Sequence, residues 1–419
     1  MPMSKNVYIN NIYIPEEKIL KNLANVLINF ALNSGEGVKK GEVVYVMLNE
    51  IAKPMLLPLQ EAILKSGAHM ILCYLPAELE RDRDETRLFY ELANEEQLNF
   101  FPEDYIKARV DAIDHVVLLL STYDHNYYQG IDQSRIAQRN RVWKKYMDMR
   151  FKKEYEGKLT WVLTDYPSPA MAEAASMTIE EYWDQVIKAC YLDEEDPIAR
   201  HRDTMRKTQQ IIDKLNSLGI ESLHVKGEDV DLHIVMGSER VFCGGTGRNI
   251  PSFEVFTSPD ARYTNGWIKF NQPLYRNGQI IRGIRLEFKD GNVVNYSADE
   301  NYEALKAMLE TDEGARRVGE FSLTDKRFSR IDRIMANTLF DENFGGEYGN
   351  THIALGQSYR DAIANQEKYS DEELKAMGFN DSAIHTDIIS TSNRRVTAKL
   401  KDGRELVIYE NGEFVGLGV

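Results

Sequence analysis

The stretch KKGEVVYVML, residues 39–48, contains a short, continuous apolar run that begins at Val43. Before it, in residues 19–32, apolar side chains recur at spacings of three and four, which is the pattern of an amphipathic helix. After it, residues 55–65 show the same helical spacing, and Gly67 is a typical helix stop. The order helix, strand, helix indicates an α/β unit, in which helices cover strands that are buried on both faces.

This alternation continues along the first half of the chain. Short apolar runs at residues 70–75, 112–121 and 159–164 follow stretches with helical character. Such alternation favours a parallel sheet covered by helices. We therefore predict an α/β protein whose N-terminal domain, residues 1–200, is built on a parallel sheet.

The second half of the chain carries a different signal. All five Asn-Gly or Asp-Gly pairs occur after residue 200, at 265–266, 277–278, 290–291, 402–403 and 411–412. Type I′ hairpin turns need positive φ at both central residues, and flanks such as VTAKL and ELVIY alternate as half-buried strands do. The change falls near a charged, helix-favouring stretch at 193–214. We predict a C-terminal α+β domain, rich in antiparallel sheet, over residues 201–419.

Composition and charge limit the classes of partner. The 419 residues carry 51 Lys and Arg against 66 Asp and Glu, a formal net charge of −15, which opposes binding to nucleic acid or anionic membranes. The apolar runs are far shorter than a membrane span, and the first residues lack the apolar core of a signal peptide. The three cysteines lie far apart, without the spacing of a metal site. We expect a cytoplasmic protein that binds neither nucleic acid nor membrane.

Three segments invite a functional interpretation and also have ordinary explanations. The aromatic loop STYDHNYYQG, residues 121–130, follows a strand and either borders a ligand cleft or packs on its neighbours. The glycine-rich stretch CGGTGRN, residues 243–249, precedes no convincing helix, so a loop with special backbone angles fits better than a phosphate cradle. The basic stretch 135–158 is more typical of a solvated helix face than of a nucleic-acid site.

Two histidines and an aspartate are candidate metal ligands. His385 and Asp387 stand two residues apart in SAIHTDIIST, a strand-like setting in which side chains at i and i+2 share one face. An imidazole and a carboxylate directed into one cavity can both bind a divalent cation such as zinc. His352 lies in GNTHIALGQSY, between two glycine-bearing turns. Taken alone, each of these residues fits a structural role equally well.

Two glutamates occur in apolar surroundings. Glu254 lies in NIPSFEVFTSPD and Glu320 in RRVGEFSLTD. A carboxylate is costly in such surroundings unless a cation meets it. A metal ion would supply the missing charge, although Arg316 and Arg317 are close enough in sequence to pair with a structural carboxylate instead.

The order of these motifs resembles that of the thermophilic aminopeptidases of the aminopeptidase T and aminopeptidase S type, a family of dinuclear metallopeptidases. The segments NIPSFEVFTSPD, RRVGEFSL, TLFDEN, HIALGQSY and HTDIIS occur in the family's order, and VKKGEVVYV and residues 166–198 extend the resemblance through the first half. The resemblance implies a set of five metal ligands, Glu254, Glu320, His352, His385 and Asp387, which together hold two divalent ions. It also implies a catalytic role for Tyr359, which follows the histidine at the family's spacing, and a homodimer. Zinc is the favoured metal, with cobalt, manganese and magnesium as alternatives.

Three departures from the family pattern bear on the pocket. Phe253 stands where family members often have glycine, FGGEYGN at 344–350 lengthens the loop before His352, and IIST at 388–391 replaces a more typical MIGS. None of them removes a ligand. They concern the choice of substrate and leave the expected metal site complete.

Our leading hypothesis is a cytoplasmic metalloaminopeptidase that hydrolyses N-terminal residues from peptides through a dinuclear metal centre and an activated water. In this hypothesis Glu254 is the general base, Glu320 bridges the metals and Tyr359 donates a hydrogen bond to the developing oxyanion. One alternative is a non-enzymatic α/β protein that binds a small molecule or peptide at residues 121–130. A nucleotide-dependent enzyme is disfavoured, because the sequence has no phosphate loop.

Overall fold

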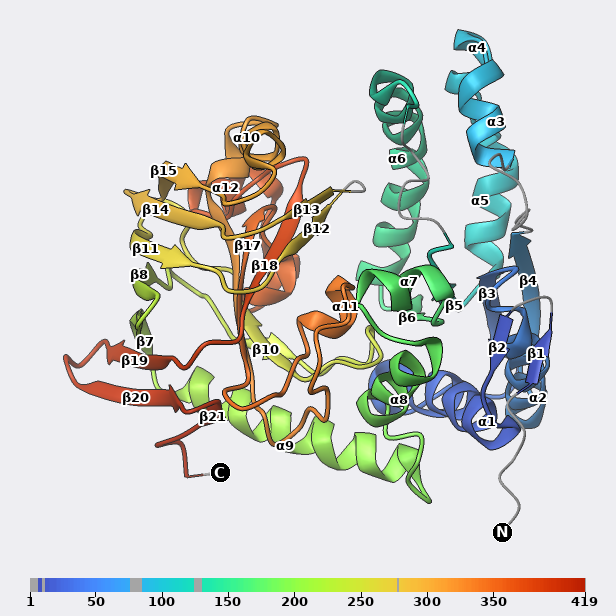
Figure 1. The fold of residues 1–419 in the computed structure, drawn as a ribbon, viewed down its shortest axis with the longest axis horizontal. Coiled ribbons are helices and arrows are strands. Elements are labelled where there is room, and N and C mark those ends of the chain that lie inside the picture. Colours follow the sequence, from blue (N-terminus) through green and yellow to red (C-terminus); the bar gives the residue numbers. More distant parts are fainter. Residues whose placement is uncertain (1–6, 10–11, 76–84, 124–129, 277–278, 419) are drawn as a thin grey trace. The chain divides into compact units, whose positions relative to one another are not determined.

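The computed structural model describes residues 7–9, 12–75, 85–123, 130–276 and 279–418. The chain divides into two compact units, one of residues 1–201 with 246–250 and the other of residues 202–245 with 251–419. The first unit contains a parallel sheet and the second contains antiparallel sheets, so the predicted mixed α/β fold class is confirmed (Figure 1).

The parallel sheet of the first unit has the strand order β4-β3-β5-β6. Its four strands correspond to the four predicted apolar runs: β3 (Val43–Asn49), β4 (His69–Leu75), β5 (His115–Leu120) and β6 (Thr160–Asp165). Tyr45 of β3, Val116 of β5 and Leu159, the residue before β6, meet in one buried apolar cluster. A separate two-stranded sheet is formed by β1 (Val7–Ile9) and β2 (Ile12–Ile14).

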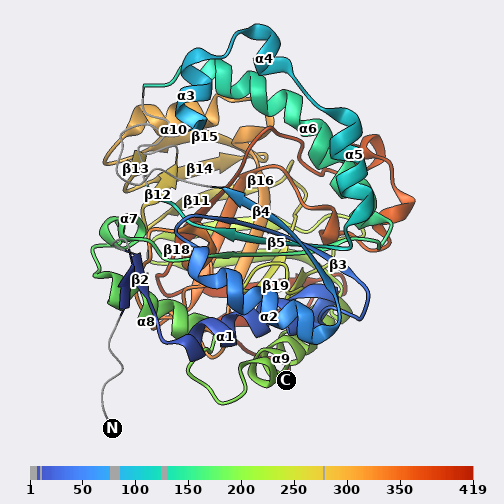
Figure 2. The ribbon, with the colours of Figure 1, turned by 90° about the vertical axis from the view of Figure 1, so that its right-hand side faces the viewer.

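Helices surround this sheet, as the alternation predicted. The pattern at 19–32 forms α1 (Glu17–Val26), which continues as a turn of π-helix to Ala31, and that at 55–65 forms α2 (Leu56–Ser66). Gly67 ends α2 with φ of 78°, as expected of a helix stop. The two helices pack together on one side of the sheet (Figure 2). The remaining helices that begin in this unit are α3 (Glu85–Leu92), α4 (Glu95–Asn99), α5 (Glu103–Ala112), α6 (Gln133–Tyr155), α7 (Pro169–Ala174), α8 (Ile179–Ala189) and α9 (Pro197–Ser217).

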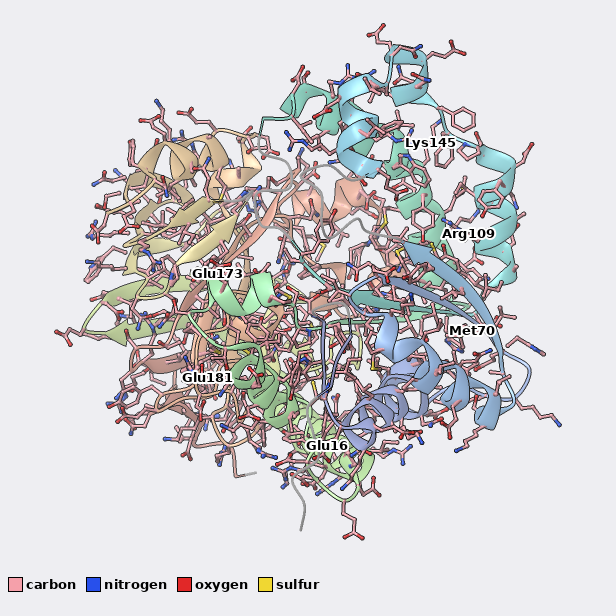
Figure 3. The ribbon with its side chains drawn as sticks, turned by 45° about the vertical axis from the view of Figure 1, so that its right-hand side comes forward. Glu16, Met70, Arg109, Lys145, Glu173 and Glu181 are labelled. Carbon is pink, nitrogen blue, oxygen red and sulfur yellow. The ribbon has the colours of Figure 1, made fainter. Side chains whose placement is uncertain are left out.

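The basic stretch 135–158 forms most of α6. Some of its lysine side chains contact other groups of the same unit. Lys153 Nζ donates to the carbonyl oxygens of residues 110, 111 and 113, at the end of α5. Arg109 of α5 stacks on the Tyr146 ring of α6 at 5.0 Å, and Lys145 lies 5.7 Å from the Phe101 ring (Figure 3). Lys153 and Lys145 of the basic stretch therefore contact groups of the same unit. The aromatic loop at 121–130 lies mostly outside the described residues.

The second unit contains an antiparallel sheet with the order β15-β14-β11-β8-β7-β19-β20-β21. Three of the predicted pairs lie in its hairpins, at 290–291, 402–403 and 411–412. The pair at 277–278 lies outside the described residues. The strands are β7 (Ile220–Gly227), β8 (Val230–Val235), β11 (Asn265–Lys269), β14 (Arg285–Lys289), β15 (Asn292–Ser297), β19 (Arg395–Leu400), β20 (Glu405–Glu410) and β21 (Glu413–Phe414).

The prediction of a hairpin turn at Asn265-Gly266 is wrong, because these two residues are the first two of strand β11. Gly266 has φ of 113°, and a Cβ there would collide with the carbonyl oxygen of Asp231 on the neighbouring strand. Asn265 Oδ1 accepts a hydrogen bond from the backbone N–H of Asp290, in the next turn along the sheet. The glycine therefore allows two strands to approach closely, and the asparagine supports another turn.

A five-stranded sheet in the second unit has the order β18-β17-β16-β10-β9. One of its faces is apolar and buried, with Phe321, Ile353 and Ile388 among its side chains. The strands are β9 (Cys243–Gly244), β10 (Glu254–Thr257), β16 (Val318–Thr324), β17 (Asn350–Gly356) and β18 (His385–Ser390). The unit is completed by the β12 (Leu274–Arg276) and β13 (Gln279–Ile281) pair and by the helices α10 (Tyr302–Leu309), α11 (Thr338–Asp341) and α12 (Asp371–Ala376). The glycine-rich stretch at 243–249 starts in β9 and continues as a loop, and three of its glycines, one in the strand and two in the loop, have positive φ.

No helix among the described residues is both long and apolar enough to cross a membrane.

Candidate metal centre

Four adjacent strands of the five-stranded sheet bring the five predicted ligands to one face. Glu320 pairs in register with Ala354, which in turn pairs with Asp387. His385 is opposite Gly356, two residues further along the same strand as Ala354. Because side chains alternate between the two faces of a strand, these residues share a face. The remaining two ligands follow the same register, since Ser322 on this face is opposite His352 and two residues from Thr324, the partner of Glu254.

Small residues leave room between the ligands. Ala354 lies between Glu320 and Asp387 across the sheet, and Ser322 and Gly356 face the two histidines. Ser322 also contacts the cluster directly, with its Oγ 3.4 Å from Glu254 Oε2. The apolar side chains on the opposite face anchor the sheet, so the ligands project from a rigid support.

The side chains form two groups that share Glu320. His352 Nε2 lies 3.2 Å from Glu320 Oε1 and 3.5 Å from Glu254 Oε2. His385 Nε2 lies 3.4 Å from Glu320 Oε2 and 3.4 Å from Asp387 Oδ1. Within each group, one ligand-type atom per residue lies within 4.8 Å of the others. Glu320 thus presents one carboxylate oxygen to each histidine.

The cluster is buried and acidic. Glu254 is 8% exposed, Glu320 3% and His352 1%. Burial, with added repulsion from Glu320 and Asp387, raises the pKa of Glu254 to about 7, although His352 opposes the shift. Three carboxylates in so small a buried volume need positive charge close by.

The two histidines supply that charge when no other cation does. Burial by itself lowers the pKa of His352, but the hydrogen bond with Glu320 and the nearby carboxylates outweigh it and raise the pKa to about 9. The same balance, with hydrogen bonds to Asp387 and Glu320, raises the pKa of His385 to about 11. A divalent ion can replace these protons, because histidine binds metal in its neutral form.

The nitrogens of His385 are arranged as in metal sites. The Nδ1 of His385 donates to the backbone carbonyl of Gln357 at 2.7 Å, which leaves Nε2 directed at the two carboxylates. Metal-binding histidines usually have such a partner on the second nitrogen, since it fixes the tautomer. The buried Nδ1 of His352 has no hydrogen-bond partner among the described residues, and its Nε2 also faces carboxylates. The donor set of two imidazoles and three carboxylates therefore fits divalent metal ions.

Comparison with known proteins identifies the family. Residues 16–414 match the thermophilic metalloprotease (M29) family. The chain belongs to this family. Aminopeptidase 2 of Geobacillus stearothermophilus is 30% identical over 404 residues, which cover 92% of this chain and 95% of that protein. Aminopeptidase AmpS of Bacillus subtilis (strain 168) is 26% identical over 410 residues, covering 93% and 98% of the two chains.

A solved structure shows the same fold. Wild-type AmpT from Thermus thermophilus superposes with a TM-score of 0.80 at 24% identity, covering 95% of this chain and 99% of that one. The resemblance stated from the sequence motifs is thus confirmed. The metalloprotease family makes this chain a hydrolase, which favours the leading hypothesis over a non-enzymatic binding protein or a nucleotide-dependent enzyme.

Tyr359 lies beside the metalloprotease cluster. Its ring centroid is 4.4 Å from that of His385, and its backbone N–H donates to Ser258 Oγ at 2.9 Å. The residue is 43% exposed, so its side chain combines contact with the cluster and access to solvent. Burial, followed by the charges of Glu320 and Asp387, raises the pKa of its hydroxyl. The hydroxyl therefore stays protonated and is able to donate a hydrogen bond.

Glu342 is a buried carboxylate near the cluster that the sequence motifs did not mark as a site residue. Burial raises its pKa well above the usual value, and the charges of Glu254, Asp387 and Glu320 add to the shift. The preceding Asp341 has a different task, since its carboxylate accepts backbone hydrogen bonds from Met335 and Asn337 at 2.6 and 3.0 Å. The TLFDEN segment carried the only signal for Glu342, as a stretch shared with the family.

The sequence offered Arg316 and Arg317 as possible partners for the Glu320 carboxylate. In the structure both arginines bind other groups. Arg316 Nε donates to the carbonyl oxygen of Leu309, and Arg317 pairs with Glu313 at 2.7 Å.

Phe253, which stands where family members often have glycine, has a defined position. Phe253 is 1% exposed, and its backbone N–H donates to Asn343 Oδ1 at 2.6 Å, so this aromatic ring is part of the core.

Proposed function

We propose that this metalloprotease is an aminopeptidase that removes N-terminal residues from peptides with the help of two divalent ions. The observation that carries the proposal is the division of Glu320 between two groups, with one oxygen near His352 and the other near His385. A single structural zinc ion takes four ligands, whereas five ligand-type side chains converge here. Two ions that share a carboxylate use all of them.

In this proposal Glu254 and His352 would hold one ion, His385 and Asp387 would hold the other, and Glu320 would be a ligand to both. Bound here, the ions would lower the pKa of a water molecule and polarise the scissile carbonyl group. Zinc is the favoured metal, and cobalt, manganese and magnesium also accept imidazole or carboxylate ligands.

The protein side chains have three tasks during hydrolysis. Glu254, whose Oε2 lies 3.5 Å from His352 Nε2, would accept a proton from the attacking water and pass it to the leaving amine. Tyr359 donates a hydrogen bond from its protonated hydroxyl to the developing oxyanion. The free α-amine of the substrate would be recognised at the cluster, where one ion can accept the neutral amine as a ligand and a carboxylate such as Asp387 can accept its hydrogen bond.

The direction of attack is the substrate-specific part of the proposal. The names of the relatives, Aminopeptidase 2 and Aminopeptidase AmpS, support cleavage from the amino end. Acetylation of the α-amine removes its charge and its charge-assisted hydrogen bonds, which are worth about 1.5 to 3 kcal/mol each. Acetylated peptides should therefore be very poor substrates.

One peptide in two forms tests this direction. An unstructured peptide, free or acetylated at its amino end, is incubated with metal-loaded enzyme, and the products are followed by mass spectrometry. We expect stepwise loss of residues from the free peptide alone. Internal fragments from both forms at similar rates would show that the enzyme is an endopeptidase.

The proposal also includes a homodimer, from the family resemblance, and a cytoplasmic location, from the composition of the sequence. Light scattering of the purified protein at several concentrations measures the oligomeric state, and fractionation of the source cells measures the location. A monomer at micromolar concentration would contradict the dimer and leave the proposed chemistry unchanged.

A further inference from the structure

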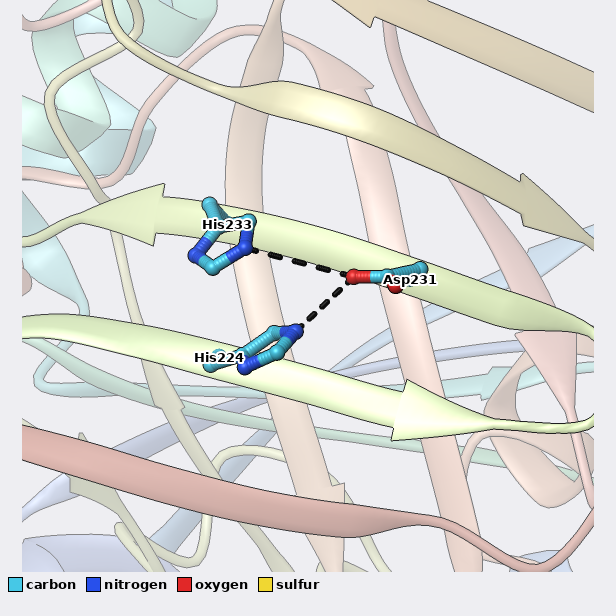
Figure 4. A group of neighbouring side chains, drawn as sticks. All are labelled: His224, Asp231 and His233. Carbon is cyan, nitrogen blue, oxygen red and sulfur yellow. Dashed lines mark hydrogen bonds and ion pairs between the residues drawn. The ribbon is translucent and has the colours of Figure 1, made fainter.

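A second group of metal-ligand side chains lies on the eight-stranded sheet, apart from the five residues of the buried cluster. His224 on β7 and His233 on β8 are direct partners in the antiparallel register. Asp231 lies two residues before His233, so its side chain is on the same face of the sheet. Figure 4 shows the three side chains gathered on these two strands, with both histidines linked to the aspartate.

The ligand atoms of this group are close together. His224 Nε2 lies 2.8 Å from Asp231 Oδ1, and His233 Nε2 lies 3.9 Å from the same oxygen. Around a tetrahedral zinc ion, with bonds of about 2.0 to 2.2 Å, neighbouring ligand atoms are about 3.3 to 3.5 Å apart. The two distances bracket this value. Small rotamer adjustments would equalise them, because the side chains are between 34% and 59% exposed.

The two imidazole rings are also held in the arrangement of a site. Their centroids are 3.9 Å apart and their planes differ by 16°, so they stack across the two strands. Two protonated rings at this separation would repel each other strongly. The stack therefore favours a neutral imidazole on at least one strand, which is the form that binds metal.

We propose that His224, Asp231 and His233 form an exposed site for one divalent transition-metal ion of the zinc, copper and nickel type. Two imidazoles and one carboxylate suit these ions and are poorly suited to magnesium or calcium. With three protein ligands, the remaining positions belong to water. Because the three side chains are between 34% and 59% exposed, the ion would exchange with solvent. The site is independent of the proposed peptidase chemistry.

The positive charge of the neighbouring Lys226 opposes binding of a cation at this site. Lys226 is the register partner of Asp231 and lies two residues after His224, on the same face. Its positive charge lowers the pKa of the Asp231 carboxyl after the larger effects of the His224 hydrogen bond. Replacement of this lysine should strengthen metal binding, which gives the proposal a variant that gains affinity.

Equilibrium dialysis of the metal-loaded enzyme against increasing Zn²⁺, followed by elemental analysis, tests the site. We expect wild type to take up one further equivalent. Binding should be at least about tenfold weaker in His224→Ala and His233→Ala, because each loses one of three ligands, and tighter in Lys226→Gln. The control is His69→Ala, which removes another exposed histidine and should bind like wild type. Excess Mg²⁺ should not displace the ion.

A spectroscopic measurement distinguishes this site from general surface binding. Cu²⁺ added as one further equivalent should give an electron paramagnetic resonance spectrum with coupling to two imidazole nitrogens in wild type, and this coupling should be lost in both alanine variants. Circular dichroism melting shows whether each variant is folded. Absence of the further equivalent in wild type would overturn the proposal. Equal uptake by wild type and both folded alanine variants would also overturn it.

Discussion

Glu320 and His352 lie side by side on adjacent strands, with Oε1 of the carboxylate 3.2 Å from Nε2 of the imidazole and both residues almost fully buried. The other oxygen of the same carboxylate is 3.4 Å from His385 Nε2. One side chain therefore belongs to both halves of the cluster. This sharing makes Glu320 the residue whose change should affect the whole site.

The substitution Glu320→Gln should abolish peptidase activity and leave the fold intact. A neutral amide cannot neutralise two cations, so both proposed ions lose a charged ligand, whereas the buried shape of the side chain is kept. Activity on aminoacyl substrates and the melting temperature are the two measurements. The matched control is Glu313→Gln, which alters an exposed carboxylate in the same unit and should retain activity. A Glu320→Gln enzyme that loses metal but works at the original rate would show that Glu320 has no part in catalysis.

Elemental analysis after mild dialysis should find two divalent ions per chain. Three carboxylates and two imidazoles exceed the four ligands of one structural zinc ion. The exposed ion proposed at His224 and His233 should be lost in the same dialysis, so His224→Ala should also retain two ions. A metal content near zero in protein never exposed to a chelator would contradict the enzyme mechanism.

The sequence predicted those parts of the fold that depend on local pattern. The run at 43–48 became a central strand, and Asp290-Gly291 formed a turn with φ of 47° and 79°, because both signals act within a few residues. Asn265-Gly266 misled the prediction because its glycine serves an approach to Asp231, a residue on another strand. Local spacing holds no information about such a contact.

In the candidate site, too, the local pattern predicted some features, whereas contacts between distant segments determined others. Period two predicted that His385 and Asp387 would share a face of one strand, and they do. Nothing in the spacing could bring Glu254, Glu320 and His352 to that face, since strand register is set by contacts between distant segments. Family resemblance supplied that step.

Tyr359→Phe should lower kcat by about 100- to 1,000-fold, the usual effect of losing one oxyanion donor. The ring that packs at 4.4 Å from His385 is kept, so metal content and KM should change little. Steady-state kinetics and elemental analysis of the same preparation measure these quantities. A rate close to wild type would leave Tyr359 with a packing role only.

His201 should make the folded protein sensitive to acid. The imidazole is 4% exposed, stacks on Phe30 at 5.2 Å, and its Nε2 lies 3.1 Å from the carbonyl oxygen of Cys190. Burial lowers its pKa from 6.5 to about 4, against the opposing effect of that hydrogen bond. The buried ring is therefore neutral under conditions in which the unfolded chain already binds a proton.

The sign of the effect follows from proton linkage. Above the unfolded pKa of 6.5 both states are neutral and stability is complete, whereas between 6.5 and about 4 only the unfolded state gains a proton. The contribution of His201 to the free energy of unfolding should thus fall by about 2 kcal/mol from about pH 7 to about pH 5. Urea unfolding of wild type and His201→Gln at both pH values measures the contribution of His201 to the free energy of unfolding, because the glutamine amide can donate to Cys190 but does not titrate. We expect the loss of stability on acidification to be smaller in His201→Gln by this amount, and unchanged in the exposed control His69→Gln. Equal losses in wild type and His201→Gln would show that the buried imidazole does not govern acid sensitivity.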